Sequence, residues 1–313
     1  MSLTTQRLID PIRIKGEQHT IDASSTGFRI HYKHENGRLF QGNSIDWLKS
    51  LDTQSVDLVF ADPPYNIKKA SWDSFKSQEE YIEWSIQWIE QASRILKENG
   101  SLYICGYSEI LSDIKHPASK FFQGCRWLIW HYKNKASLQS DWGRSHESII
   151  HFRKSKRPIF NVDDVRLPYG AHTLRYPDRQ QADSSAFHGL KKSKDDSWTP
   201  HPLGAKPRDV IDIPTTCNGM GEKTPHPTQK PEELIRRFIL ASSNKQDIVL
   251  DPFSGSGTTL VAAEQLGRKW LGCDLSPEYN QWAINRLINV QQMGVDDWIK
   301  YDRLNKERRE GIR

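Results

Sequence analysis

An α/β domain built on a mostly parallel sheet is the fold class that this sequence predicts. Short apolar runs of strand length alternate with helical runs in the C-terminal third, a pattern typical of parallel sheets. Two predicted strands, residues 55–61 and 247–253, end in an acidic or glycine-rich loop, and open α/β sheets bind ligands at the carboxyl ends of strands. With 313 residues and 36% hydrophobic content, the chain can form one large domain with an insertion.

The N-terminal half holds a helix and several strands after a polar start. Residues 1–35 are expected to form a loosely attached arm, and residues 36–154 to form the first half of the domain. An apolar stripe predicts an amphipathic helix over residues 78–98, closed by Gly100. Three further strands are expected at residues 101–107, 126–132 and 147–154.

Residues 155–222 lack any periodicity. Lysines and arginines are interleaved there with aromatic residues, histidines and prolines. A long irregular stretch inside a compact protein is usually functional or disordered. We therefore expect an insertion with a function of its own.

Regular structure returns in residues 223–292, the second half of the domain. A helix is expected to start with Pro231 in its first turn, and another to start after Ser276 as N-cap. Between them lie a strand at 247–253, a helix ending at Gly267 and a strand at 269–275. Residues 293–313 form a charged tail, expected to be peripheral.

Composition narrows the class of protein. The formal net charge is +5, which suits a polyanionic partner without requiring one. The four cysteines are far apart and form no CxxC pair, so we expect reduced structural thiols and no metal site. No run approaches the roughly 18 apolar residues of a membrane span, and the N-terminal residues lack a signal-peptide core. A cytoplasmic protein without a membrane partner is expected.

The tetrapeptide DPPY, Asp62 to Tyr65, follows the buried strand at 55–61. Pro63 and Pro64 have no N–H for a sheet and stiffen the backbone. The sequence therefore predicts that Asp62 and Tyr65 are held rigidly at the carboxyl end of a strand. The alternative is a proline-rich turn with a packing tyrosine.

A second loop, DPFSGSGTTL at residues 251–260, lies between a strand and a helix. Gly255 and Gly257 allow a sharp turn and a close approach of a ligand, and the first N–H groups of the helix favour an anion. A P-loop would need a lysine before the threonine, and a dinucleotide fingerprint would need glycine in place of Leu260. A bare turn without a ligand is the remaining alternative.

Asp274 ends the next predicted strand, roughly twenty residues after the loop, where an acid can accept hydrogen bonds from ribose hydroxyls. The glycine loop and Asp274 together indicate a nucleoside cofactor without a diphosphate, and S-adenosylmethionine fits. A helix N-cap or a solvated strand end is the alternative for Asp274.

The two loops together resemble those of the amino-group DNA methyltransferases. Because DPPY precedes the glycine loop, the order resembles the beta subclass, a circular permutation of the Rossmann-like S-adenosylmethionine-dependent methyltransferase fold with helices on both faces of the sheet. Three further segments resemble that family: GNSIDWLKSL at 42–51, RSHESIIHF at 144–152 and HPTQKP at 226–231. The resemblance implies that residues 155–222 are a target-recognition region.

The resemblance also implies an activity and partners. It implies methyl transfer from S-adenosylmethionine to N6 of an adenine flipped out of double-stranded DNA. The alternatives are cytosine N4, for which the family tends to carry SPPY, an amine or amide of RNA or protein, and a catalytically dead DNA-binding module. Members of the family often pair as homodimers. The enzyme would either belong to a restriction–modification system, with a cognate restriction endonuclease as a further partner, or act as a solitary modification enzyme.

Site residues follow from the resemblance by position. Asp62 and the carbonyl of Pro63 would accept hydrogen bonds from the target amine and draw its lone pair out of the ring, Pro64 would stiffen the site, and Tyr65 would stack on the base. Thr228 and Lys230 are expected near the carboxylate of the cofactor, with a solvated Lys230 as the alternative. The predicted cofactor-binding residues are Asn43 (where the family has aspartate), His226, Thr228, Lys230, Asp251, Phe253, Ser254, Gly255, Gly257, Thr258 and Asp274.

Overall fold

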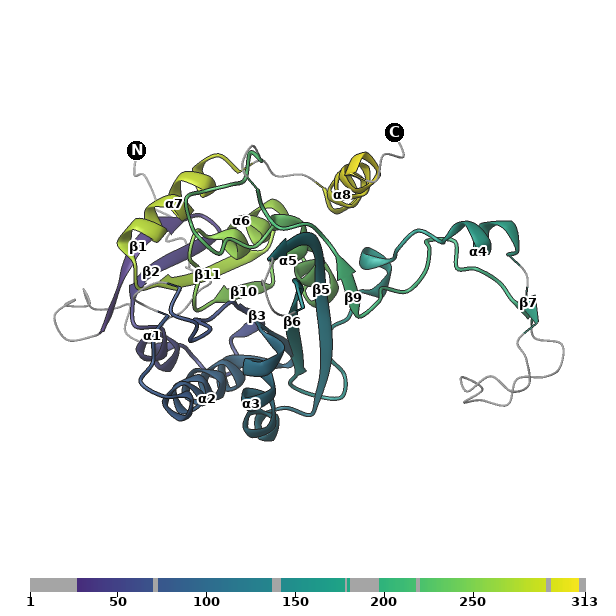
Figure 1. Cartoon of the computed structure of the whole chain (residues 1–313). Coiled ribbons are helices and arrows are strands. Elements are labelled where there is room, and N and C mark those ends of the chain that lie inside the picture. The colour runs from purple at the N-terminus through teal and green to yellow at the C-terminus, as the bar shows by residue number, and fades with distance from the viewer. Residues whose placement is uncertain are drawn as a thin grey trace, which may run out of the picture.

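A nine-stranded mixed sheet forms the centre of the protein (Figure 1). The computed structural model describes residues 27–69, 73–136, 142–177, 179–180, 197–217, 220–290 and 294–309. The strand order is β1-β2-β11-β10-β3-β4-β6-β5-β9. The strands of this sheet are β1 (Phe28–His34), β2 (Gly37–Gly42), β3 (Val56–Ala61), β4 (Leu96–Gly106), β5 (Gly124–Ala136), β6 (Arg144–Arg153), β9 (Val210–Asp212), β10 (Ile248–Asp251) and β11 (Lys269–Asp274).

The middle of the sheet is parallel, as the sequence predicts. β2, β11, β10, β3 and β4 pair in parallel with their neighbours. β1 is antiparallel to β2, and β6 is antiparallel to both β4 and β5. The predicted α/β class is therefore confirmed, with antiparallel pairs toward the two ends of the sheet.

Helices cover both faces of the sheet (Figure 1). One face packs against α1 (Ser44–Ser50), α2 (Gln78–Ile95) and α3 (Ser108–Ala118), and the other against α5 (Glu232–Ser242), α6 (Thr258–Gln265) and α7 (Pro277–Ile288). The remaining helical segments are η1 (Ser119–Phe121), η2 (Val162–Val165), α4 (Ala171–Arg175) and α8 (Val295–Arg309). Within the described ranges, no helix is both long and apolar enough to cross a membrane.

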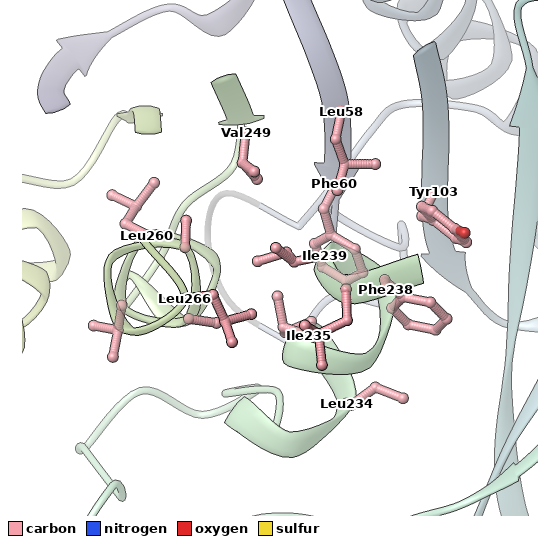
Figure 2. Packing of buried hydrophobic residues seen from close by; sticks show 14 of the residues in the cluster. Leu58, Phe60, Tyr103, Leu234, Ile235, Phe238, Ile239, Val249, Leu260 and Leu266 are labelled. Carbon is pink, nitrogen blue, oxygen red and sulfur yellow. The ribbon is translucent and has the colours of Figure 1, made fainter. Parts of the chain in front are cut away.

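Strand β3 shows why both faces must be covered. All six of its residues are buried. Leu58 and Phe60 belong to the hydrophobic cluster under α5 and α6, whereas Val59 and Ala61 belong to the cluster under α1 and α2. Because successive side chains of a strand point to opposite faces, a strand with buried apolar residues on both faces needs an apolar partner on each side. Figure 2 shows Leu58 and Phe60 facing the α5 side chains.

The sheet reverses its winding direction between β10 and β3. The chain leaves β3 through α2 and returns in β4 on one side, and it leaves β10 through α6 and returns in β11 on the other side. Such a switch point opens a crevice at the carboxyl ends of the two strands, where ligands bind in open α/β sheets. The DPPY and glycine loops follow these two strands, so the topology brings both to the same crevice.

The structure corrects the predicted N-terminal arm and the predicted end of the helix at residues 78–98. Residues 28–34 form edge strand β1, hydrogen-bonded to β2, instead of a loose arm; the rest of the predicted arm, residues 1–26, lies outside the described residues. Helix α2 ends at Ile95, so β4 already includes Gly100. A Cβ on Gly100 would lie 2.8 Å from the carbonyl oxygen of Asp57, so this glycine permits close strand packing rather than helix closure.

The predicted insertion and tail have some regular structure. The described parts of residues 155–222 contain η2, α4, a two-stranded sheet of β7 (Arg179–Gln180) and β8 (Ser197–Trp198), and β9, which pairs with β5. α4 and β7 extend away from the sheet (Figure 1). The tail forms α8, whose Trp298 is buried and whose Asp302 bonds Arg236 of α5 at 2.6 Å. The domain boundaries themselves stay a prediction.

Candidate active site

A cavity of about 600 Å³ lies at the switch point of the sheet. Its volume is typical of small-molecule sites. All but one of the predicted site residues line it: Asn43, Asp62, Pro63, Pro64, Tyr65, His226, Thr228, Lys230, Asp251, Phe253, Ser254, Gly255, Thr258 and Asp274. The exception is Gly257. The cavity has an Asp62 side, after β3, and a glycine-loop side, after β10 and β11.

On the Asp62 side, four polar side chains bond to one another. The hydroxyl of Tyr65 lies 2.7 Å from Oδ1 of Asp62 and 3.0 Å from Oε2 of Glu147. Nζ of Lys230 lies 2.8 Å from Oδ2 of Asp62 and 3.3 Å from the same Glu147 oxygen. We call Asp62, Tyr65, Glu147 and Lys230 the carboxylate ring. Its members come from the DPPY loop, β6 and the segment before α5.

The two donors of the ring are fixed in their protonated forms. Burial, followed by the negative charges of Asp62 and Glu147, raises the pKa of Tyr65 well above its ordinary value. Burial would lower the pKa of Lys230, but the two carboxylates outweigh that effect and raise it. At neutral pH the ring therefore holds a phenol and an ammonium between two acids.

The structure pairs Lys230 with Asp62. The contact near the carboxylate of the cofactor, which the resemblance implies, stays a prediction. A buried ammonium needs a counter-charge, and the nearest pair of carboxylates lies on the Asp62 side. Lys230 is not solvated, since its side chain is only 7% exposed.

Asp73 holds the DPPY loop through hydrogen bonds to its backbone. One carboxylate oxygen of Asp73 accepts bonds from the backbone N–H groups of Tyr65 and Asn66 at 2.6 and 2.7 Å. The other oxygen accepts from Ile67 and Lys69. The carbonyl of Pro64 accepts a bond from the hydroxyl of Tyr81 at 2.8 Å. The loop is therefore fixed through its backbone as well as through its prolines.

The glycine-loop side is held mainly by backbone contacts. Buried Asp251 accepts bonds from the Phe253 N–H at 3.0 Å and the Thr259 hydroxyl at 2.5 Å, which closes the turn between β10 and α6. Burial raises the pKa of Asp251 to about 7. Arg286 of α7 donates a hydrogen bond to the carbonyl of Ser256 at 2.8 Å. These contacts fix the turn before any ligand is bound.

The two glycines of the loop serve different purposes. Both have positive φ values, 49° at Gly255 and 78° at Gly257, a region that favours glycine. A Cβ on Gly257 would lie 2.6 Å from Cβ of Ala283, so this glycine lets α7 pack against the loop. A Cβ on Gly255 would lie 2.9 Å from Nε2 of His226, inside the cavity. Only Gly255 therefore lies where a ligand could approach the backbone.

Asp274 joins the two loops of the glycine-loop side. Its carboxylate accepts bonds from the N–H groups of Gly255 at 2.8 Å and Ser276 at 2.9 Å. Burial raises its pKa to about 6. A carboxylate has more lone pairs than these two bonds use, so it can also accept from ligand hydroxyls. Asn43 lines the cavity too, but its side-chain oxygen accepts bonds from Ile45 and Asp46 as the N-cap of α1.

The HPTQKP segment closes the cavity between its two sides. Its Gln229 bonds the carbonyl of Glu222 at 2.6 Å and the backbone N–H of Thr224 at 2.8 Å, which ties the segment to the end of the predicted insertion. His226 is neutral at pH 7, because burial lowers its pKa to about 4. Pro231 is the N-cap of α5 rather than its first residue.

The sequence interpretation did not single out Glu147, Asp73 or Arg286, although all three contact the loops of the site. Glu147 lies in the RSHESIIHF segment, whose acid could have been singled out as a buried charge within a predicted strand. Asp73 and Arg286 lie in stretches that carry no motif. Their contacts to the loops exist only in the folded chain.

The residues that line the cavity are of the kinds that S-adenosylmethionine requires. An acceptor at the end of β11, a glycine backbone open to the cavity and apolar Phe253 and Leu275 lie on one side. Leu275 is 67% exposed although it lines the cavity, which suits a surface that a ligand covers. Asp62 of the carboxylate ring lies on the other side.

Comparison with known proteins gives the family. A family model for DNA methylases of the N6/N4 class matches residues 56–285. The Type II methyltransferase M1.MboII of Moraxella bovis is 36% identical over 82% of this chain and 97% of its own length. The DNA adenine methyltransferase YhdJ of Escherichia coli K12 is 32% identical over 86% and 88% of the two chains.

Two solved structures share the fold. The PvuII DNA methyltransferase, described as cytosine-N4-specific, has a TM-score of 0.63 at 18% identity and covers 88% of this chain and 94% of its own. The M1.HpyAVI–SAM complex has a TM-score of 0.54 at 22% identity, with 80% and 98% covered. The resemblance expected from DPPY and the glycine loop is confirmed: this chain belongs to the N6/N4 family of DNA methylases.

Proposed function

We propose that this protein is a site-specific DNA adenine methyltransferase. It transfers the methyl group of S-adenosylmethionine to the exocyclic N6 of an adenine flipped out of duplex DNA. The observation that carries the proposal is the rigid placement of Asp62 at the end of β3, across one cavity from the glycine loop and Asp274. A target amine and a nucleoside cofactor can meet in that cavity.

The chain's own residues explain how an unreactive amine becomes a nucleophile. The lone pair of an aromatic amine is delocalised into the ring. Asp62 and the carbonyl of Pro63 accept hydrogen bonds from the two N–H groups, which favours a tetrahedral nitrogen with a localised lone pair. The carbonyl of Pro64 accepts a bond from Tyr81, which holds the backbone of this loop in place. When bound, the cofactor supplies an electrophilic methyl group on its sulfonium.

The cofactor is proposed to lie on the glycine-loop side. Asp274 accepts from the ribose hydroxyls, and the backbone at Gly255 with Thr258 at the start of α6 faces the amino-acid end. Asp251 and Gly257 act by shaping the loop. Lys230 acts on the Asp62 side, through the carboxylate ring.

Tyr65 is proposed to contact the flipped base with its ring. It is 9% exposed, and its ring meets Tyr107 edge-on at 5.1 Å between centroids. Its hydroxyl is held by the carboxylate ring. The exposed part of the ring is therefore fixed in direction, as a stacking surface requires.

Adenine is favoured over cytosine as the target. Asp62 gives DPPY, the form the family tends to carry for adenine, and the relative YhdJ is described as an adenine methyltransferase. The cytosine-N4-specific PvuII structure shares only the fold at 18% identity. Cytosine N4 methylation, which uses the same chemistry, remains the second candidate.

The partner is proposed to be double-stranded DNA read by residues 155–222. The described part of this region includes α4 and β7, which extend away from the sheet, and carries Arg166, Arg175, Lys206 and Arg208. Arginine and lysine bind phosphates and guanine edges. Because M1.MboII and other relatives are Type II methyltransferases, we further propose a role in restriction–modification, with a cognate endonuclease.

The proposal is tested by methylating duplex DNA with tritiated S-adenosylmethionine and then analysing the nucleosides. The expected product is N6-methyladenine at one short repeated motif. N4-methylcytosine would correct the base and keep the chemistry. Label in RNA or protein but not in DNA would overturn the proposed substrate.

A further inference from the structure

Each of the two donors in the carboxylate ring lies within reach of two carboxylate acceptors. The hydroxyl of Tyr65 reaches Asp62 at 2.7 Å and Glu147 at 3.0 Å. The ammonium of Lys230 reaches Asp62 at 2.8 Å and Glu147 at 3.3 Å. In both cases Asp62 is the nearer acceptor, and both contacts to Glu147 involve the same oxygen, Oε2. Small rotations of either donor would exchange one acid for the other.

This arrangement creates a conflict at Asp62. Each of its carboxylate oxygens already accepts a bond from one ring donor: Oδ1 from Tyr65 and Oδ2 from Lys230. A target amine can still bond to the remaining lone pairs of these oxygens, but it then shares the acid with two other donors. Bonds from donors as strong as a buried ammonium also withdraw negative charge from the acceptor. Asp62 is therefore a weaker acceptor in this state than an acid free of both donors.

Glu147 is placed to remove that conflict. Its side chain is 14% exposed, similar to the 17% of Asp62, so both acids are largely withdrawn from solvent. It stands on β6, a strand bonded to both β4 and β5, so its backbone is fixed. Transfer of both donors to Glu147 would keep every buried polar group bonded while one Asp62 oxygen faces the substrate.

We propose that Glu147 is a positioning residue that takes over the donors of Tyr65 and Lys230 when the target amine binds Asp62. The inference rests on the proposed amine methylation, and it holds for adenine and cytosine amines alike. It assigns Glu147 a role through Asp62 and no direct contact with the substrate. A purely structural Glu147 would instead serve only as a second counter-charge for Lys230.

A double-mutant cycle separates the two roles. The variants are Glu147→Gln, Tyr65→Phe and the two combined, with single-turnover methylation at saturating DNA and cofactor as the readout. An amide is a weaker acceptor than a carboxylate, so Glu147→Gln is expected to slow the reaction about 10- to 100-fold. In the Tyr65→Phe background, Lys230 is the one ring donor left to move from Asp62 to Glu147. The rate decrease caused by Glu147→Gln should therefore be smaller there, by roughly threefold or more.

Binding measurements and a control variant complete the test. The dissociation constants of Glu147→Gln for cofactor and DNA should stay within about twofold of the wild type. Glu109→Gln removes an acid whose side chain is 70% exposed, from a pair with Arg144 of β6, and should leave the rate unchanged. If Glu147→Gln does not fold, Glu147→Asp keeps the counter-charge of Lys230 but withdraws the acid by one methylene, and it should still slow the reaction.

Other outcomes overturn the inference. If Glu147→Gln slows the reaction equally with and without the Tyr65 hydroxyl, Glu147 is only a structural counter-charge. A wild-type rate for Glu147→Asp would lead to the same conclusion. The wild-type enzyme reports separately on the proposed function. A wild type that does not label DNA overturns both, whereas a labelling wild type with uncoupled variants overturns the role of Glu147 alone.

Discussion

The two sides of the cavity are held together in different ways. On the glycine-loop side, Asp251 bonds groups two and eight residues away, and Asp274 bonds groups two and 19 residues away. On the Asp62 side, Tyr65 bonds Glu147 across 82 residues and Lys230 bonds Asp62 across 168. The first side is a set of local turns, and the second is a meeting of distant side chains.

The two sides should therefore respond to different kinds of substitution. Local turns depend on backbone conformation and on small volumes, so the glycine-loop side should respond to added atoms and to the loss of single acids. The carboxylate ring depends on the balance of charges from three segments. A single charge change there should alter chemistry more than binding.

The largest effect is expected from Asp62→Ala. Removal of an acceptor that acts on the reacting nitrogen should lower the single-turnover rate about 10²- to 10³-fold or more, in the range of a lost electrostatic contact in other enzymes. Lys230 keeps Glu147 as counter-charge at 3.3 Å, so the fold should survive. Cofactor binding, measured by calorimetry, should change little.

Asp62→Asn is the matched control for this substitution. It keeps one acceptor oxygen and should retain more activity than Asp62→Ala. A simultaneous loss of cofactor and DNA binding in both variants would mean that Asp62 is a structural acid, and that the two sides are not separable.

The second-largest effect is expected on the glycine-loop side of the cavity. Asp274→Ala removes a charged acceptor, worth about 1.5–3 kcal/mol, and should raise the dissociation constant of S-adenosylmethionine roughly 10- to 100-fold. The rate at saturating cofactor should be far less affected than in Asp62→Ala. An unchanged dissociation constant would remove Asp274 from the cofactor site and reduce it to a bridge between Gly255 and Ser276.

Asp274 should also make the affinity for S-adenosylmethionine depend on pH. Burial raises the pKa of Asp274 to about 6, and the charged form accepts bonds from hydroxyls. Affinity for the cofactor should therefore be full above that pKa and fall as pH drops through it, about tenfold between pH 7 and about pH 5. Titration calorimetry across this range would measure it. The step should vanish in Asp274→Asn; a step that persists would point to Asp251, whose pKa burial raises to about 7.

The smallest effect on methyl transfer is expected from the packing glycine. Gly257→Ala adds a methyl group 2.6 Å from Ala283 at a φ of 78°, so strain and overpacking should cost about 2–4 kcal/mol of unfolding free energy. Gly267→Ala has a similar φ of 69° but open space around it, and should cost only the strain, about 1–2 kcal/mol. Urea unfolding of both variants measures the difference; equal losses would mean that α7 adjusts freely.

Much of the fold could be predicted from local pattern. The helix–strand alternation gave the parallel centre of the sheet, and Ser276 was recognised as an N-cap because capping involves only its own helix. Strand β1 was missed because it is a half-exposed edge strand whose partner, β2, decides its conformation. Gly100 was misread because its close neighbour, Asp57, comes from another strand.

The family, the two loops and most residues that line the cavity can be identified from local sequence, because turns and glycines act on the backbone next to them. Which charged side chains meet becomes visible only in the folded chain. The tertiary structure places Lys230 against Asp62, brings Glu147 into the same ring and shows that Gly257 serves the packing of α7. The reason is that a hydrogen bond between side chains depends on distances across the sheet, which spacing along the chain does not encode.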